Sequence, residues 1–111
     1  KNTSMTGLYT SAADAAVILT RLNSGSDLSQ ASQKAFMDSL AGQIYRGALP
    51  QGFAGSQVFD KVGFRGTVEY HDTAIVQLKN GRRYIVSLLS ENLGTRNIAE
   101  LGRRLEARLG Q

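Results

Sequence analysis

The stretch Asp60-Lys61-Val62-Gly63, followed by Tyr70-His71-Asp72-Thr73-Ala74-Ile75-Val76, decides the fold of this 111-residue chain. The two runs predict two adjacent strands that carry a lysine and a glycine at one edge of a sheet. Such an edge is a place to hold a substrate. Because a Lys-x-Gly triplet recurs by chance in many proteins, its meaning depends on the residues around it.

The C-terminal half contains three predicted strands, over residues 57–63, 71–78 and 82–90. A two-residue Asn80-Gly81 turn of the kind that favours hairpins joins the last two, so we expect an antiparallel meander. Residues 84–89 are almost continuously apolar, which is typical of a strand buried on both faces. The sequence therefore predicts an α+β fold with helices on each side of the sheet.

Helical patterns occupy residues 10–22 and 32–45 and a last segment that ends near Leu109. Thr10 or Ser11 can cap the first helix, because Asp14 follows Ser11 by three positions as in a capping box. A tight loop is expected at Leu49-Pro50-Gln51-Gly52. We expect a single partial domain, with a helical segment over residues 1–56 and a β-meander plus C-terminal helix over residues 57–111.

The order of these motifs resembles the C-terminal part of class A β-lactamases and related penicillin-recognising serine hydrolases. The residues that carry the resemblance are Thr10-Ser11-Ala12-Ala13-Asp14-Ala15-Ala16, Leu49-Pro50-x-Gly52, Asp60-Lys61-x-Gly63, His71-Asp72-x-Ala74-Ile75-Val76 and Ile98-Ala99-Glu100-Leu101-Gly102. The resemblance covers roughly residues 10–109. It implies the C-terminal part of a three-layer α/β/α fold and an extracytoplasmic location, periplasmic or secreted.

The nucleophile motif of that family, Ser-x-x-Lys, does not occur in this chain. The residues three positions before Lys34, Lys61 and Lys79 are Ala31, Val58 and Val76. Ser90-Glu91-Asn92 spells the second family motif, Ser-x-Asn, but it comes after Lys-x-Gly and follows a strand, so we interpret it as coincidence. The chain also begins at Lys1 without an initiator methionine. We interpret it as a fragment that is inactive alone.

The resemblance implies roles for five consecutive residues. Lys61 would supply positive charge near the nucleophile and the substrate carboxylate, and Gly63 would let the substrate backbone approach closely. The backbone N–H of Phe64 would serve the oxyanion hole, although its ring would narrow the site or add an apolar subsite. Val62 replaces a typical Thr or Ser hydroxyl. Arg65 is either a substitute carboxylate anchor or a solvated turn arginine.

Composition excludes several other classes. The chain has no cysteine, hence no disulfide framework and no thiolate zinc site, and no apolar run approaches a membrane span. The lone His71 cannot build a familiar zinc site, so we interpret it as structural. No metal or cofactor is expected. Tyr45, Tyr70 and Tyr84 are interpreted as core or boundary aromatics.

The net charge of +4 raises the question of nucleic acid. Six of the nine arginines fall within residues 82–108, mostly on the last helix and off its predicted apolar stripe of Ile98, Leu101, Leu105 and Leu109. Glu100 precedes Arg104 by four residues, which supports a helix. Since no aromatics interleave with these arginines, we expect a solvated face and no nucleic-acid partner.

Three functions remain open. The first is the C-terminal segment of a β-lactamase-like serine hydrolase acting on a β-lactam or a cell-wall peptide amide. The second is a non-catalytic relative that binds a small molecule or peptide beside Lys61, and the third is a basic α+β interaction module. An exposed strand edge leads us to expect association with a missing N-terminal segment or with a second copy.

Overall fold

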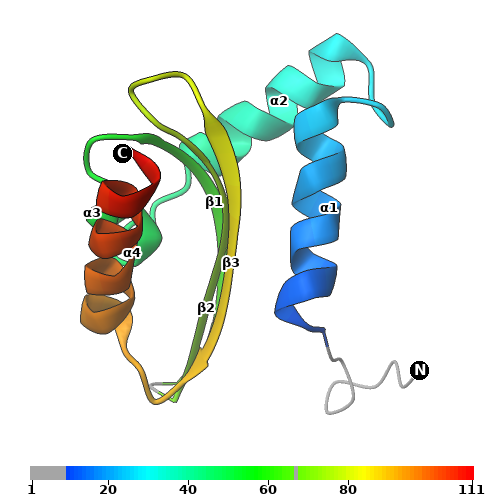
Figure 1. Cartoon of the computed structure of the whole chain (residues 1–111). Helices are drawn as coiled ribbons and strands as arrows, with labels where there is room; N and C mark the ends of the chain where they lie inside the picture. Colours follow the sequence, from blue (N-terminus) through cyan, green and yellow to red (C-terminus); the bar gives the residue numbers. More distant parts are fainter. Residues whose placement is uncertain (1–9, 67) are drawn as a thin grey trace.

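The computed structural model describes residues 10–66 and 68–111 and has helices on both sides of one antiparallel sheet. In Figure 1, α1 and α2 lie on one side of the sheet, and α3 and α4 lie on the other. The α+β class and the layering predicted from the sequence are confirmed. The elements are α1 (Ala12–Ser24), α2 (Gln30–Ala41), α3 (Leu49–Gly52), β1 (Gln57–Arg65), β2 (Glu69–Gln77), β3 (Arg83–Glu91) and α4 (Thr95–Leu109).

The strand order is β1-β2-β3, so β1 and β3 are the two edges of the sheet in the described part of the chain. Leu78 N donates to Arg82 O at 2.9 Å and closes the hairpin between β2 and β3. The turn therefore holds three residues, not the two predicted. Gly81, at φ 87°, supplies the left-handed residue that a three-residue hairpin needs.

Side chains alternate between two hydrophobic clusters, one on each face of the sheet. Val58 and Val76 belong to the cluster under α3 and α4, together with Leu49, Phe53 and Ile98. The other face carries Phe59 and Ile75, which pack against Leu19, Leu22, Met37 and Leu40 of α1 and α2. The period of two along β1 and β2 thus assigns each residue to one face.

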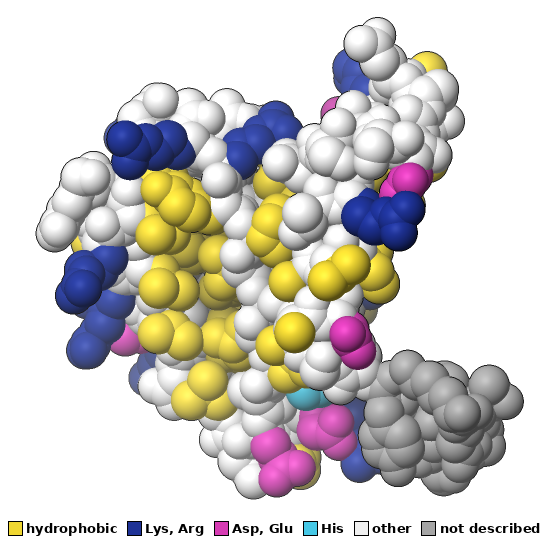
Figure 2. Space-filling model, turned by 45° about the vertical axis from the view of Figure 1, so that its right-hand side comes forward, with side chains coloured by type: hydrophobic (Ala, Val, Ile, Leu, Met, Phe, Trp, Pro, Cys, Tyr) yellow, Lys and Arg dark blue, Asp and Glu magenta, His cyan; other side chains and the backbone are white. Residues whose placement is uncertain are grey.

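β3 is only half-buried, although its sequence predicted burial on both faces. Tyr84 to Leu89 are all partly exposed. The helices do cover both faces, but β3 is an edge strand, and an edge leaves one side of every residue open. On the side of the molecule drawn in Figure 2, hydrophobic side chains gather in a band.

Two helix boundaries differ from the prediction. Ser11 caps α1 as expected, accepting a bond from Asp14 N at 3.1 Å. However, α2 ends at Ala41 and not at residue 45, because Gly42 caps it and the chain then turns back toward β1. Residues 49–52, expected to be a loop, form a one-turn helix with Pro50 near its start, where its missing N–H costs nothing.

The buried stripe of α4 differs at one position. Ile98 is fully buried, but Leu101 is 41% exposed and Gly102 takes the buried place. A Cβ at Gly102 would lie 3.2 Å from Phe53, and one at Gly52 would lie 2.0 Å from the Ala99 carbonyl oxygen. Two glycines therefore allow α3 and α4 to touch through their backbones.

Candidate active-site edge of the sheet

The outer edge of β1 carries all of the sequence-predicted site residues. Arg46 Nη2 donates to Val58 O at 3.1 Å, and Lys61 Nζ donates to Val62 O at 2.6 Å. These carbonyls therefore face away from β2. Because alternate residues of a strand direct both backbone groups to the same side, the N–H and C=O of Phe64 also point outward.

The hairpin gives the same result independently. The ladder bond between Leu78 and Arg82 places residues 76, 74, 72 and 70 in hydrogen-bonded pairs with β3. The intervening residues of β2, 71, 73 and 75, then bond to Gly63, Lys61 and Phe59. The even-numbered residues of β1 are left with outward backbone groups, and the odd-numbered residues of β3 are left likewise.

Positions 61 and 63 lie on the face of β1 that carries α1 and α2, and the Lys61 side chain projects from that face. Both are exposed, and the register places Lys61 opposite Thr73, which in turn lies opposite Ser87. The Thr73 and Ser87 hydroxyls are 3.3 Å apart. A polar row that begins at Lys61 thus crosses this face of the sheet, beyond the hydrophobic row of Phe59 and Ile75.

Val62 and Phe64 lie on the opposite face, and they differ from each other. Val62 is buried at 5% exposure, whereas Phe64 is 51% exposed at the open edge. The Phe64 ring stacks on Tyr70 with centroids 5.7 Å apart and meets Tyr45 edge-on at 5.4 Å. The Phe64 ring is therefore held against two tyrosines, while its backbone N–H faces the open edge.

Tyr45 was not predicted as part of this site. It lies in the irregular segment between α2 and α3, far from Phe64 in sequence and half exposed. The sequence predicted a helix over residues 32–45, which would include Tyr45. Nothing in that pattern predicts a contact between Tyr45 and β1. The contact depends on the early end of α2, which only the Gly42 cap marks.

Arg65 ends β1 and is paired within its own hairpin. Its Nη2 lies 2.8 Å from Glu69 Oε2, and its side chain is 84% exposed. Exposed pairs of this kind contribute little to stability and open readily. The guanidinium is therefore positioned at the site edge, with Glu69 as its partner in this structure.

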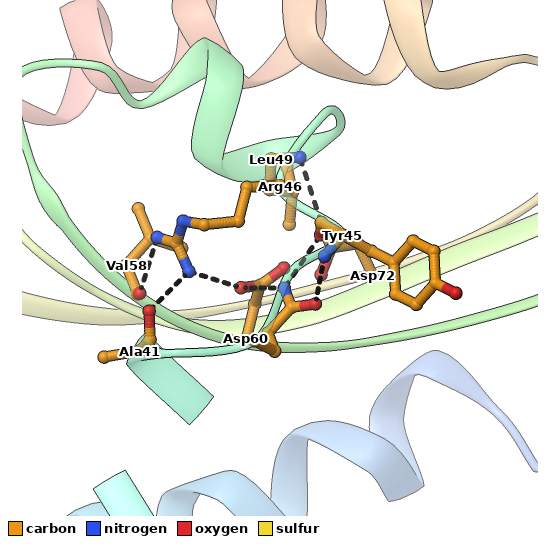
Figure 3. A network of polar contacts seen from close by, with 8 residues as sticks. Ala41, Tyr45, Arg46, Leu49, Val58, Asp60 and Asp72 are labelled. Atoms are coloured by element: carbon orange, nitrogen blue, oxygen red, sulfur yellow. Dashed lines mark hydrogen bonds and ion pairs between the residues drawn. The ribbon is translucent and has the colours of Figure 1, made fainter. Parts of the chain in front are cut away.

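A buried carboxyl pair lies directly behind Lys61. Asp60 and Asp72 are both fully buried, and the register makes them diagonal neighbours on the α3 and α4 face of the sheet. Asp60 Oδ1 accepts a bond from Gln43 Nε2 at 2.8 Å and lies 3.5 Å from Arg46 Nη1. Asp72 Oδ2 accepts a bond from Leu49 N at 3.0 Å. Figure 3 shows this network around Arg46 and Asp60.

Each carboxyl group keeps one oxygen, Asp60 Oδ2 and Asp72 Oδ1, without a partner in the described residues. Burial is the largest cause that raises the pKa of Asp72, and together with the neighbouring Asp60 carboxyl group it raises this pKa to about 9. Two adjacent carboxylates cannot both ionise cheaply in a site of low dielectric. The sequence motifs contain Asp60 and Asp72 as separate residues. They did not predict that the two carboxyl groups form a buried pair.

His71 has a structural environment, as predicted. Its Nδ1 accepts a bond from Ser90 N at 3.0 Å, and its Nε2 lies 3.5 Å from Glu69 Oε1. It therefore ties β2 to β3 near the end of the sheet. No group of three metal-ligating side chains occurs in residues 10–66 and 68–111.

A depression in the surface of the described residues lies away from this edge. It has a volume of about 500 Å³ and is lined at the hairpin end of the sheet by Ser56, Lys79, Asn80 and Glu106, among others. Glu106 accepts bonds from Gly55 N at 3.0 Å and Ser56 Oγ at 2.6 Å, which ties the loop before β1 to α4. Glu106, the one acidic residue of this lining, is therefore already engaged by the fold, and we place the functional site at the β1 edge.

The arginines of α4 are partly neutralised, in keeping with a solvated face. Arg103 Nη2 lies 2.6 Å and Arg104 Nε lies 3.0 Å from the same oxygen of Glu100. The two guanidinium groups hold the pKa of Glu100 down to about 2. Among the described helices, none is long and apolar enough to cross a membrane.

Comparisons with known proteins agree with the fold. The family model described as "Beta-lactamase enzyme family" matches residues 1–109. A mutant of PBP-A, solved as an acyl-enzyme complex with penicillin G, is 25% identical with a TM-score of 0.83, covering 91% of this chain and 40% of that one. A search of curated protein sequences gave no match.

Two further solved structures are class A β-lactamases. The reconstructed ancestor of the Gram-negative enzymes is 28% identical with a TM-score of 0.76, covering 86% of this chain and 40% of that one. The enzyme of Clostridium kluyveri is 21% identical with a TM-score of 0.77, covering 89% and 41%, and shows the fold alone. This chain thus spans less than half the length of these proteins. The chain belongs to the β-lactamase enzyme family.

Proposed function

We propose that this chain is the C-terminal segment of a β-lactamase-like serine hydrolase and is inactive without the rest of that protein. The observation that carries the proposal is the open edge of β1, where exposed Lys61 and the outward N–H of Phe64 lie close together in sequence and space. The substrate class is a β-lactam or a cell-wall peptide amide. The serine, its lysine and the deacylating carboxylate would come from the part that precedes this segment.

Each residue of the edge has a specific task in this proposal. The Lys61 ammonium, which reaches Val62 O at 2.6 Å, supplies positive charge to the nucleophile and to a substrate carboxylate. The Phe64 N–H donates to the oxyanion that forms during acyl transfer, which is the largest single contribution in many hydrolases. Gly63 leaves open space, since a Cβ there would meet nothing within 4 Å.

Two residues set the limits of the substrate class. Val62 has no hydroxyl for a substrate carboxylate, and losing a hydrogen bond to a charged group costs about 1.5–3 kcal/mol. Arg65 lies three positions along the strand and is exposed, so it replaces that hydroxyl by exchanging Glu69 for the substrate. A carboxylate-bearing ligand would therefore compete with the 2.8 Å ion pair between Arg65 and Glu69.

The partner of this segment docks at β3. The outward backbone groups of Ile85, Ser87 and Leu89 are available for a further strand, and partly exposed apolar side chains flank them. A strand from the preceding part of the same protein completes the sheet, or a second copy takes its place when that part is absent. Membership of this family supports a location of the whole protein outside the cytoplasm, in the periplasm or secreted.

The test of this function is acylation of the chain alone. With no Ser-x-x-Lys, it should form no adduct with a fluorescent penicillin and should not hydrolyse a chromogenic cephalosporin. A covalent adduct detected by mass spectrometry on a purified chain would contradict the proposal.

A non-catalytic ligand-binding relative is the second candidate. The observation that favours it is the half-exposed Phe64 ring, fixed between Tyr45 and Tyr70 at the edge where a substrate would lie. If the ring and the missing hydroxyl are what limit acylation in the complete protein, Val62→Thr with Phe64→Ser should raise it. An unchanged acylation rate in a protein that has Ser-x-x-Lys would place the barrier elsewhere.

A further inference from the structure

We propose that the depression at the hairpin end of the sheet is a second binding site, for a small organic anion that carries a carboxylate or phosphate on an apolar group. The inference goes beyond the proposed hydrolase function. The depression is bounded by the loop before β1, whereas Lys61 and Phe64 lie toward the other end of that strand and take no part in its lining. The site is therefore compatible with an enzyme and with a binding protein.

Three segments that are distant in sequence form the depression: the loop before β1, the hairpin between β2 and β3, and the last turns of α4. In Figure 1 they meet at the same end of the sheet, near the label C. The volume of about 500 Å³ lies within the range of small-molecule sites. The depression stays open because four of its lining residues are small, namely Gly55, Ser56, Ala107 and Gly110.

The polar groups left available in the depression are mainly hydrogen-bond donors. Lys79 forms no ion pair with any of the described residues. Asn80 Oδ1 accepts a bond from Arg82 N at 2.9 Å, which leaves the NH₂ group of Asn80 as a donor. Arg103 donates from Nε and Nη2 to Glu100, at 3.0 and 2.6 Å, and Nη1 is left as a further donor.

One acidic side chain, Glu106, also lines the depression. Its Oε2 accepts the bonds from Gly55 N and Ser56 Oγ, at 3.0 and 2.6 Å, so this carboxylate stabilises the loop before β1. The ammonium of Lys79 and the guanidinium of Arg103 outnumber it. Two cations and a free amide donor favour an anionic ligand over a cationic one.

The distribution of charge along the sequence supports the same sign of ligand. Residues 1–78 contain six cationic and six acidic side chains, whereas residues 79–111 contain seven and three, so the second part holds the whole net charge of +4. A hollow within a positive region raises the local concentration of small anions. Leu78, which is buried, and Ala107 supply an apolar wall. An anion with an apolar portion therefore fits better than inorganic phosphate.

Two-dimensional NMR titrations of the full chain test the site with four probes. Phenyl phosphate and benzoate are aryl anions, whereas benzyl alcohol lacks the charge and inorganic phosphate lacks the ring. An aryl anion should shift the amide signals of Ser56, Asn80 and Ala107 in a saturable way, and the tighter of the two identifies the preferred anionic group. The alcohol and inorganic phosphate should bind about five-fold more weakly or less. The proposal is overturned if neither aryl anion gives saturable shifts, or if the alcohol or inorganic phosphate binds as tightly.

Three variants separate the site from general surface charge. Ala107→Trp places an indole in the hollow without changing its charge, and it should abolish binding of the aryl anion. Lys79→Ala should weaken binding about five-fold. Lys34→Ala is the matched control, because it removes an exposed cation from α2 on the other side of the sheet, and it should leave binding unchanged.

Unchanged binding in a folded Ala107→Trp chain would refute the hollow as the site. Equal affinities in Lys79→Ala and Lys34→Ala would refute the role of Lys79, and this comparison decides alone if Ala107→Trp does not fold.

Discussion

The two edges of the sheet differ in how many of their outward backbone groups are bonded by side chains. At β1, side chains from the segment after α2 reach the outward carbonyl of Val58, while Lys61 covers that of Val62. At β3, no comparable bond reaches the outward groups of Ile85, Ser87 or Leu89 in the described residues. An edge that carries polar side chains resists strand addition, and an open apolar edge invites it. This difference is the reason why we propose the β1 edge for the ligand and the β3 edge for the partner.

The largest effect on association should come from blocking the edge of the sheet at β3. Proline at Ser87 removes an outward N–H without breaking a ladder bond to β2, so the chain should remain folded while its association is abolished. Light scattering at micromolar concentration measures this. Ser87→Ala keeps the N–H and loses only the 3.3 Å contact with Thr73, and it should still associate.

The corresponding change at the other edge sharpens the comparison. Phe64→Pro also removes an outward N–H, but it should leave association unchanged if, as we propose, the partner docks at β3 and not at β1. A wild-type chain that is monomeric, unfolds cooperatively and binds no hydrophobic dye would break the contrast. It would indicate instead that the described fold is complete as a small domain.

Substitutions at two glycines, Gly52 and Gly63, distinguish a residue needed for stability from one needed for the site. Gly52→Ala should destabilise the chain by about 3 kcal/mol or more, since the new Cβ would lie 2.0 Å from a backbone oxygen that cannot move away. Gly63→Ala should leave the unfolding free energy within about 1 kcal/mol of wild type or raise it, because the position is open. Urea unfolding measures both.

In the complete protein, Gly63→Ala should slow acylation despite its normal stability, because the methyl group would stand where substrate backbone approaches. Equal acylation rates for Gly63→Ala and wild type would show that the open edge of β1 is not the substrate side. This result would leave the docking role of β3 untouched.

The smallest effect is expected for the aromatic cluster. Phe64→Ala removes a stack at 5.7 Å and an edge contact at 5.4 Å from a ring that is half exposed, so it should cost about 1 kcal/mol. Phe64→Leu keeps much of the apolar area and should cost less. A loss of several kcal/mol would mean that the cluster is part of the core and not a surface of the site.

The sequence predicted the elements that repeat a regular pattern. Alternation along β1 and β2, the Ser11 cap and the apolar run of β3 identified the strands, the first helix and the layers. The sequence-based prediction failed where a single glycine decides where a helix ends or which of its residues is buried. Gly42 ends α2 early, and Gly102 replaces Leu101 in the buried stripe because α3 approaches too closely for a side chain.

The same distinction holds for the site. Lys61 and Gly63 could be identified because they belong to a local motif, but the partner of Phe64 could not. The segment that carries Tyr45 is held to β1 by the contacts of Gln43 and Arg46 with Asp60, which join residues distant in sequence. Burial of Asp72 was equally hidden, since its neighbours in the chain, His71 and Thr73, are partly exposed.

The central claim is that the β1 edge becomes catalytic only when the preceding part of the protein is supplied. Mass spectrometry can follow penicillin acylation of this chain, of the preceding segment, and of the two mixed or expressed together. The account predicts an adduct on a serine of the preceding segment, in the mixture only. An adduct on this chain alone, or none in a folded mixture whose preceding segment contains Ser-x-x-Lys, would contradict it.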